Sequence, residues 1–196
     1  GNEENQVLSY LLASLLKARE ALACPSQDKE YDEDVNVYLS HLLYDYAQPQ
    51  YRLKSQRYVM SSELDLNQRL EEVQDVGERY FLFKVNGDEL LIGLGLFKNK
   101  GTTFRDRYSY WGHNSKFYQS EASSYYREAA QWNQRIYHKR TAVAEVLNKL
   151  STKLEKYIQI LGKVSSEYFD FFHLSFKKEL HMLETTGLKD EFLDHF

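Results

Sequence analysis

The stretch VAEVLNKLSTKLEKYIQILGKVSSEYFDF, residues 143–171, decides what kind of fold this chain can adopt. Apolar side chains recur in it at alternating spacings of four and three residues, at Val143, Leu147, Leu150, Leu154, Tyr157, Leu161, Val164, Tyr168 and Phe171. At the overall apolar fraction of 42%, such a run in one fixed register has odds on the order of 1 in 2,000. The spacing predicts one long helix of coiled-coil or bundle type, about 45 Å long.

A second apolar seam precedes this stretch and bears on how many helices follow it. Residues 118–136 carry apolar side chains at spacings of four and three, but the two seams do not share one register. Either the chain turns back near His138–Thr141, or one very long helix over 116–172 carries a stutter there. We expect the turn, because a single helix of about 80 Å would outgrow a compact domain of this size.

The N-terminal third reads as three shorter helices. Pro25 follows the first and Pro49 ends the second, while Ser62 and Asp65 resemble a capping box that opens the third. Apolar side chains at helical spacing predict that these helices cover residues 4–23, 35–47 and 63–76.

Three features of this region depart from the helical pattern. Arg19 falls within the apolar stripe of the first helix. Residues 28–34 hold five carboxylates against one lysine, which predicts a solvated acidic run. Residues 50–60 have no clear period, which favours a loop or a short edge strand.

The period changes again after residue 78. The run YFLFKV is followed by Asn86-Gly87-Asp88 and then by ELLIGLGLF. Two apolar runs around an Asn-Gly pair predict an antiparallel β-hairpin, inserted at about 79–98. The second run is apolar on both faces, so helices or a partner must cover both sides. Gly93 and Gly95 lie on one face and predict the close approach of a helix or another backbone.

Composition indicates a mainly α protein, a single domain over 1–196 built as a bundle of about five helices. The net charge of −4 gives no indication of nucleic acid, and no apolar run is long enough for a membrane span. The single Cys24 excludes an intramolecular disulfide framework. We expect a cytoplasmic protein, although the start at Gly1 leaves a removed signal peptide open. We expect no cofactor, and no metal because the chain contains no Glu-x-x-His pair.

The candidate site lies in residues 98–113. Its basic side chains, with one carboxylate among them, give this segment a local charge of +3 beside several aromatic rings. Basic groups next to aromatic faces suit an anionic ligand with a planar part, such as a nucleotide or single-stranded RNA. The alternative is a connection whose cations are solvated while its rings pack. The candidate ligand-binding residues are Lys98, Lys100, Arg105, Arg107, Tyr110, Trp111 and His113, with a second basic spot at Arg52, Lys54 and Arg57.

Arg107 and His113, separated by five residues, form a spacing that resembles the R-x(4–6)-H motif of HEPN-type ribonucleases, which are small all-helical proteins. The resemblance implies that the arginine would hold phosphate and that the histidine would act in acid–base cleavage. It covers only seven residues, and Tyr108 stands where the family favours a small polar residue.

The apolar surface predicted for residues 143–171 and for both faces of the hairpin exceeds what the short N-terminal helices can cover. We therefore expect a non-enzymatic interaction or scaffold protein that forms a homodimer or binds another helical protein. The alternative is a module that binds nucleotide or RNA, or a HEPN-like nuclease, centred on 98–113.

Overall fold

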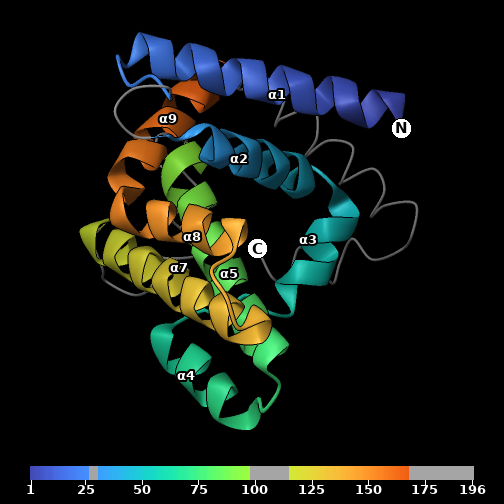
Figure 1. Cartoon of the computed structure of the whole chain (residues 1–196), viewed down its shortest axis with the longest axis vertical. Coiled ribbons are helices and arrows are strands. Elements are labelled where there is room, and N and C mark those ends of the chain that lie inside the picture. Colours follow the sequence, from blue (N-terminus) through green and yellow to red (C-terminus); the bar gives the residue numbers. More distant parts are fainter. Residues whose placement is uncertain (27–30, 98–114, 168–196) are drawn as a thin grey trace.

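A computed structural model of the protein describes residues 1–26, 31–97 and 115–167 (Figure 1). Within these ranges the chain forms eight α-helices and one π-helical turn, and no β-strand. The elements are α1 (Asn2–Ala21), α2 (Glu33–Tyr46), α3 (Pro49–Gln56), α4 (Glu63–Glu72), α5 (Val76–Ile92), η1 (Gly93–Phe97), α7 (Ser115–Tyr137), α8 (Ala142–Thr152) and α9 (Leu154–Glu167). The mainly helical prediction is confirmed, with more helices than the five expected.

The three N-terminal helices are confirmed as α1, α2 and α4. Figure 1 shows α1 across one end of the molecule and α4 at the opposite end. The predicted cap is present, because the Ser62 Oγ accepts a hydrogen bond from the backbone N–H of Asp65 at 3.1 Å. The expectation of a loop or edge strand over 50–60 is wrong for 50–56, which belong to α3, and is confirmed as a loop for 57–60. Pro49 stands in the first turn of α3, where its fixed φ and missing N–H favour helix initiation.

The predicted β-hairpin at about 79–98 is wrong. Its described residues are helical, and the Asn-Gly pair lies inside α5. The buried side chain of Asn86 donates to the carbonyls of Tyr58 at 2.9 Å and Leu82 at 2.8 Å. It also accepts from the backbone N–H of Met60 at 2.8 Å. The asparagine therefore fastens α5 to the segment between α3 and α4 instead of forming a turn.

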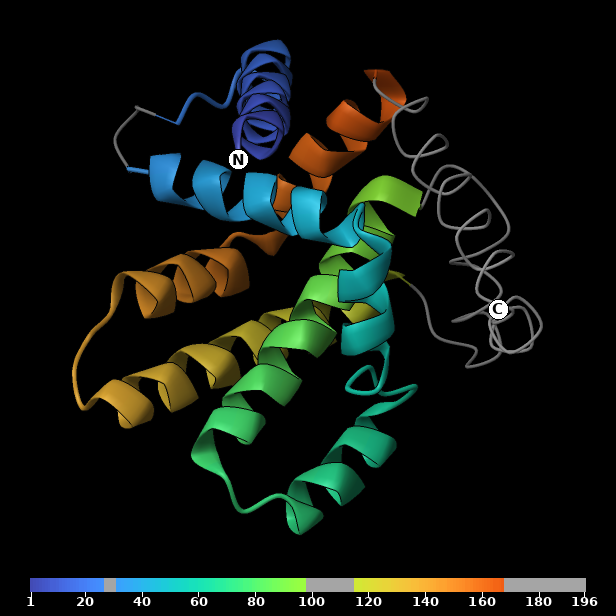
Figure 2. The ribbon, with the colours of Figure 1, turned by 90° about the vertical axis from the view of Figure 1, so that its right-hand side faces the viewer.

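Burial explains why this segment is a helix. A helix that is apolar all round belongs in a core, and a short apolar run does not by its period separate that helix from a buried strand. Figure 2 shows α5 in the interior, with other helices around it. Leu82 and most apolar side chains in its second half are buried, as are the leucines of η1; they include Leu90, Leu91, Ile92, Leu94 and Leu96.

The close approach predicted at the glycines is confirmed at Gly95. A Cβ added to Gly95 would lie 2.6 Å from the Cβ of Leu161, so only glycine lets α9 pack at this distance. Gly95 belongs to the π-helical turn η1, in which the Leu96 carbonyl accepts a hydrogen bond from the Ser165 Oγ at 2.9 Å. A side chain of α9 thus satisfies a carbonyl of the widened turn.

The predicted turn near His138–Thr141 is confirmed. α7 ends at Tyr137, and His138 adopts a left-handed conformation with a φ of 51°. Thr141 then caps α8, since its side chain accepts from the backbone N–H of Ala144 at 3.0 Å.

The single long helix over 143–171 is wrong, because the chain breaks at Lys153 between α8 and α9. α8 runs back along α7, whereas α9 leaves in another direction toward α1 (Figure 2). Two hydrogen bonds of 2.7 Å join the Ser123 and Ser151 side chains to each other's carbonyls and hold α8 on α7. The break keeps the apolar stripe inside: among its residues up to 167, those from Leu147 to Val164 are buried, and only Val143, 42% exposed, is not.

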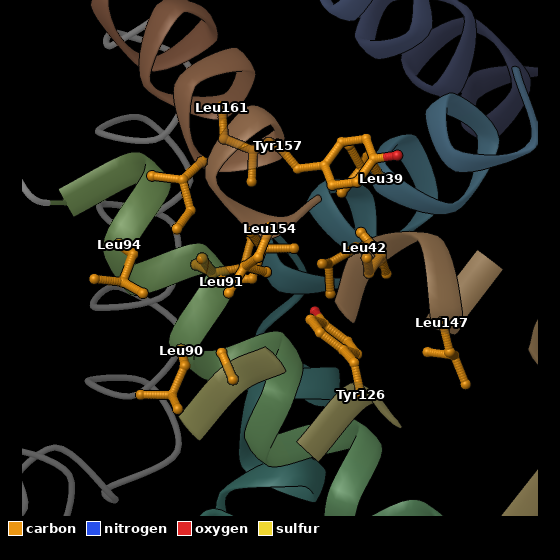
Figure 3. Close-up of a cluster of buried hydrophobic side chains, with 14 of the residues drawn as sticks. Leu39, Leu42, Leu90, Leu91, Leu94, Tyr126, Leu147, Leu154, Tyr157 and Leu161 are labelled. Atoms are coloured by element: carbon orange, nitrogen blue, oxygen red, sulfur yellow. The ribbon is translucent and has the colours of Figure 1, made fainter. Parts of the chain in front are cut away.

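The core is built from at least six elements. Side chains of α2, α5, η1, α7, α8 and α9 meet in one cluster (Figure 3), with Leu39, Leu91, Tyr126, Leu147 and Tyr157 among them.

Within the three described ranges, every helix is too short or too polar to cross a membrane.

Candidate functional site

The predicted ligand-binding residues lie outside the described residues. This holds for all seven of them: Lys98, Lys100, Arg105, Arg107, Tyr110, Trp111 and His113. The second basic spot is described and lies on and just after α3. There the Arg52 guanidinium lies 5.0 Å from the centre of the Tyr46 ring, and the Arg57 Nε donates to the Lys54 carbonyl at 3.2 Å. The meeting of the two basic spots stays a prediction.

A cluster of polar side chains around a buried carboxylate joins three helices, and the sequence analysis does not predict it. Asp88 of α5 is buried, and its Oδ1 accepts from the hydroxyls of Tyr38 at 2.6 Å and Tyr126 at 2.8 Å. Its Oδ2 accepts from the Lys84 Nζ at 2.7 Å. We call these four residues the Asp88 cluster. It links α5 to α2 through Tyr38 and to α7 through Tyr126.

The sequence builds this cluster from local spacing and one glycine. Lys84 and Asp88 are four residues apart, so they lie on the same face of α5 and form an ion pair. Gly87 precedes Asp88 and leaves room for the Tyr126 ring to lie against the backbone of α5. The Lys-x-x-x-Asp spacing is a signal that the sequence carries, although it does not indicate burial.

The electrostatics of the Asp88 cluster hold its groups in their resting protonation states. Burial raises the pKa of both Tyr38 and Tyr126 well above the usual value, and the charge of Asp88 raises it further. Burial alone would lower the pKa of Lys84, but Asp88, together with Tyr51 and Tyr80, outweighs it and raises that pKa. A catalytic lysine or tyrosine acting as base or nucleophile needs the opposite shift. The cluster therefore suits a structural link between helices.

A second cluster, which we call the Asp32 cluster, ties the α1–α2 connection to α9. The buried Asp32 Oδ2 accepts from the Arg19 Nη1 at 3.0 Å and the Lys156 Nζ at 2.6 Å, and its Oδ1 accepts from the Tyr157 hydroxyl at 2.7 Å. The Arg19 Nε donates to the Asn36 Oδ1 at 2.6 Å. The expectation that the acidic run is solvated is thus wrong for Asp32. The sequence feature that indicates a buried partner is Arg19, which stands in the apolar stripe of α1.

Two donors in the Asp32 cluster have no acceptor. The Arg19 Nη2 and the Asn36 Nδ2 are buried without a hydrogen-bond partner. Each unsatisfied buried donor costs about 1–3 kcal/mol. For Asp32 itself, burial acts to raise the pKa, but hydrogen bonds from Lys156, Tyr157 and Arg19 outweigh it and hold the pKa below the usual value. Asp32 is therefore a stable anion, and the two orphan donors are the weak point of its cluster.

No candidate metal-binding site occurs in the part of the chain that the structure describes. There, His, Cys, Asp and Glu side chains do not gather in groups of three or more that could hold an ion. Comparison of the chain with protein-family models, with curated proteins and with solved structures gave no match.

Proposed function

We propose that this protein is a non-enzymatic interaction protein that forms a homodimer through one edge of α1. The carrying observation is a row of leucines at four-residue steps, Leu8, Leu12 and Leu16, which we call the α1 edge. Leu8 and Leu12 are half-buried, and Leu16 is 44% exposed. α1 packs mainly on α2 and α9 and lies at the outside of the molecule (Figure 1), which leaves this edge accessible.

The sequence predicts the self-association surface at residues 143–171 and at the hairpin, and the proposal places it on the α1 edge instead. The stripe of α8 and α9 and both faces of α5 lie within the chain's own core, so they offer little surface to a partner. Leu16 remains exposed at the end of the row, and Tyr10 and Leu22 of the same helix are also exposed. An outer helix with an apolar margin is a common docking element.

A second copy of the chain fits this edge by its geometry. Residues at four-residue steps form a ridge, and two such ridges interdigitate when helices cross. A two-fold axis through the row would set the same ridge on both subunits, which gives an isologous contact. The non-enzymatic part of the proposal is supported by the Asp88 and Asp32 clusters, whose pKa directions favour their resting states. We also propose a cytoplasmic location, which the free thiol of Cys24 suits.

Sedimentation equilibrium of the full chain at micromolar concentration tests the homodimer. We expect a dimer for the wild type and a shift to monomer for Leu16→Glu, because each subunit would place a charge in the contact. The matched control is Leu64→Glu on α4, at the far end of the molecule, where Leu64 is 76% exposed. Circular dichroism checks that both variants are folded. A monomeric wild type, or a Leu16→Glu variant that dimerises like the control, would overturn the proposal.

The alternative function, binding of an anionic ligand or HEPN-like cleavage at 98–113, keeps its own test. Arg105→Ala and Arg107→Ala should together weaken binding of RNA or nucleotide and flatten its dependence on salt. If neither the wild type nor this variant binds, or if both bind alike, the alternative fails.

A further inference from the structure

The connection between α7 and α8 carries a concentration of positive charge. We define the α7–α8 corner by Arg135, Tyr137, His138, Lys139 and Arg140, all of which are exposed. No acidic residue occurs between Glu128 and Glu145 in the sequence. Among the residues that the structure describes, no ion pair joins Arg135 or Lys139 to a carboxylate. Arg140 approaches Glu145 only to 3.7 Å, and its side chain is 82% exposed.

One of these cations is held in place by an aromatic ring. The Arg135 guanidinium lies 4.4 Å from the ring centre of the half-buried Trp132, and Arg79 of α5 lies 5.3 Å from the same ring. Arg79 is committed to the fold, since it donates to the carbonyls of Val73 at 2.9 Å and Leu70 at 3.0 Å. Arg135 donates no such hydrogen bond to a backbone carbonyl among the described residues. A guanidinium resting on a ring keeps its donors free for a planar oxyanion such as phosphate.

An exposed ring stands beside these cations. Tyr137, the last residue of α7, is 57% exposed, and the left-handed His138 directly after it turns the chain back. The turn brings Lys139 and Arg140 to the N-terminus of α8. The positive end of the α8 dipole lies there, so helix stability gives no reason for Arg140 at this position. An anion at the corner would be attracted by the cations and by the helix end together.

We infer that the α7–α8 corner is a binding surface for single-stranded nucleic acid. Cations alone would suit any polyanion, but Tyr137, an exposed ring between Arg135 and Lys139 in the chain, adds a platform on which an unpaired base can stack. Three cations imply about three phosphate contacts, and hence a slope of about −2 for log K against log salt concentration. Binding should therefore be weak and should depend strongly on salt. This inference is independent of the proposed homodimer, because the α1 edge and the corner share no residue.

Fluorescence anisotropy with a labelled oligouridylate tests the inference on the full chain at 50 mM salt. We expect Arg135→Glu, Lys139→Glu and Arg140→Glu, combined, to weaken binding at least about tenfold. Tyr137→Ala should weaken it at least about fivefold, the lower end of the effect of losing one stacked base. The matched control is the triple variant Lys17→Glu, Lys116→Glu and Arg127→Glu, which changes net charge equally at exposed sites on α1 and on α7 before the corner.

Four outcomes would overturn the inference. The wild type could fail to bind at 50 mM salt, or the corner variant and its charge-matched control could lose binding equally. Heparin could bind as tightly as the oligonucleotide while Tyr137→Ala has no effect, which would indicate a general polyanion surface. Binding could also depend on Arg105 and Arg107 and not on the corner. The Leu16→Glu variant should bind like the wild type, which separates this inference from the homodimer.

Discussion

Gly87 and Tyr126 are packed so closely that a Cβ on Gly87 would lie 3.1 Å from two carbons of the Tyr126 ring. The same ring carries a hydroxyl that donates to Asp88, the residue after Gly87, at 2.8 Å. The glycine therefore provides room for a helix contact, and the hydroxyl fixes the ring in that contact. The Asn-Gly pair that predicts a turn in the sequence serves helix packing in the fold.

The first prediction follows from this contact. Gly87→Ala adds a better helix former, worth about 1 kcal/mol, but it forces a buried ring that cannot retreat, which costs about 1–3 kcal/mol. We expect a net loss of about 1 kcal/mol in the free energy of unfolding, measured by urea denaturation. In a Tyr126→Phe background the ring is released from Asp88, so Gly87→Ala should cost less. An equal or larger cost in that background would contradict this account.

The second prediction concerns the ion pair of the Asp88 cluster. Asp88→Asn keeps an oxygen for both tyrosine hydroxyls, but it turns an amide N–H₂ toward the Lys84 ammonium, so a donor faces a cation. We expect a loss of about 2–3 kcal/mol in unfolding free energy. Adding Lys84→Met removes the facing cation and should restore at least about 1 kcal/mol. If the double variant is as unstable as the two single losses summed, the two groups are not coupled.

Local signals explain what the sequence predicts well. The helices α1, α2 and α4 and the turn at His138 depend on spacing, proline positions and caps, which act within a few residues. The hairpin prediction fails because an apolar run without a period fits a buried strand or a buried helix equally. The Asn-Gly pair favours the strand, whereas in the structure Gly87 and Gly95 make room for Tyr126 and Leu161 of neighbouring helices, a contact that the sequence does not show.

Tertiary contacts decide the features that the sequence does not predict. The break at Lys153 interrupts a stripe that stays in phase on both sides of it, so no change of period marks the break. Arg19 and Asp32 form their buried ion pair at 3.0 Å across thirteen residues, and the other partners of Asp32 come from α9, more than a hundred residues away. The candidate segment 98–113 lies outside the described residues, so its role stays a prediction.

The third prediction concerns pH. The folded state lowers the pKa of Asp32 below its unfolded value of about 3.9, so this carboxylate contributes stability above that pH. The contribution is lost as the pH falls through the lower, folded pKa. Asp32→Asn should therefore destabilise the protein at pH 7 by about 3–5 kcal/mol, since it leaves Arg19 and Lys156 without their anion.

The pH profile separates charge from shape in this test. As the pH falls below about 4, the wild type should lose its advantage over Asp32→Asn, and their unfolding free energies should converge. Glu20→Gln, at an exposed position of α1, is the control and should follow the wild type throughout. A constant difference between the wild type and Asp32→Asn from pH 7 to pH 2.5 would mean that the carboxylate acts by shape and not by charge.

The fourth prediction uses the two orphan donors of the Asp32 cluster. Asn36→Asp removes the unsatisfied Nδ2 and replaces it with a second carboxylate oxygen beside the Arg19 guanidinium, whose Nε already bonds to Oδ1 at 2.6 Å. The side chain could then accept from Nε and Nη2 in the bidentate arrangement that arginine favours, and the two acids would balance the charges of Arg19 and Lys156.

We expect Asn36→Asp to raise the unfolding free energy at pH 7 by about 1 kcal/mol, because both orphan donors disappear in one substitution. Asn36→Leu is the matched comparison: it also removes the orphan amide, but it takes the acceptor from the Arg19 Nε and should destabilise the protein. The gain of Asn36→Asp should vanish at low pH, where the new carboxylate is protonated. If Asn36→Asp is as unstable as Asn36→Leu at pH 7, repulsion from Asp32 outweighs the bidentate pair, and the orphan donors are not what limits stability at this junction.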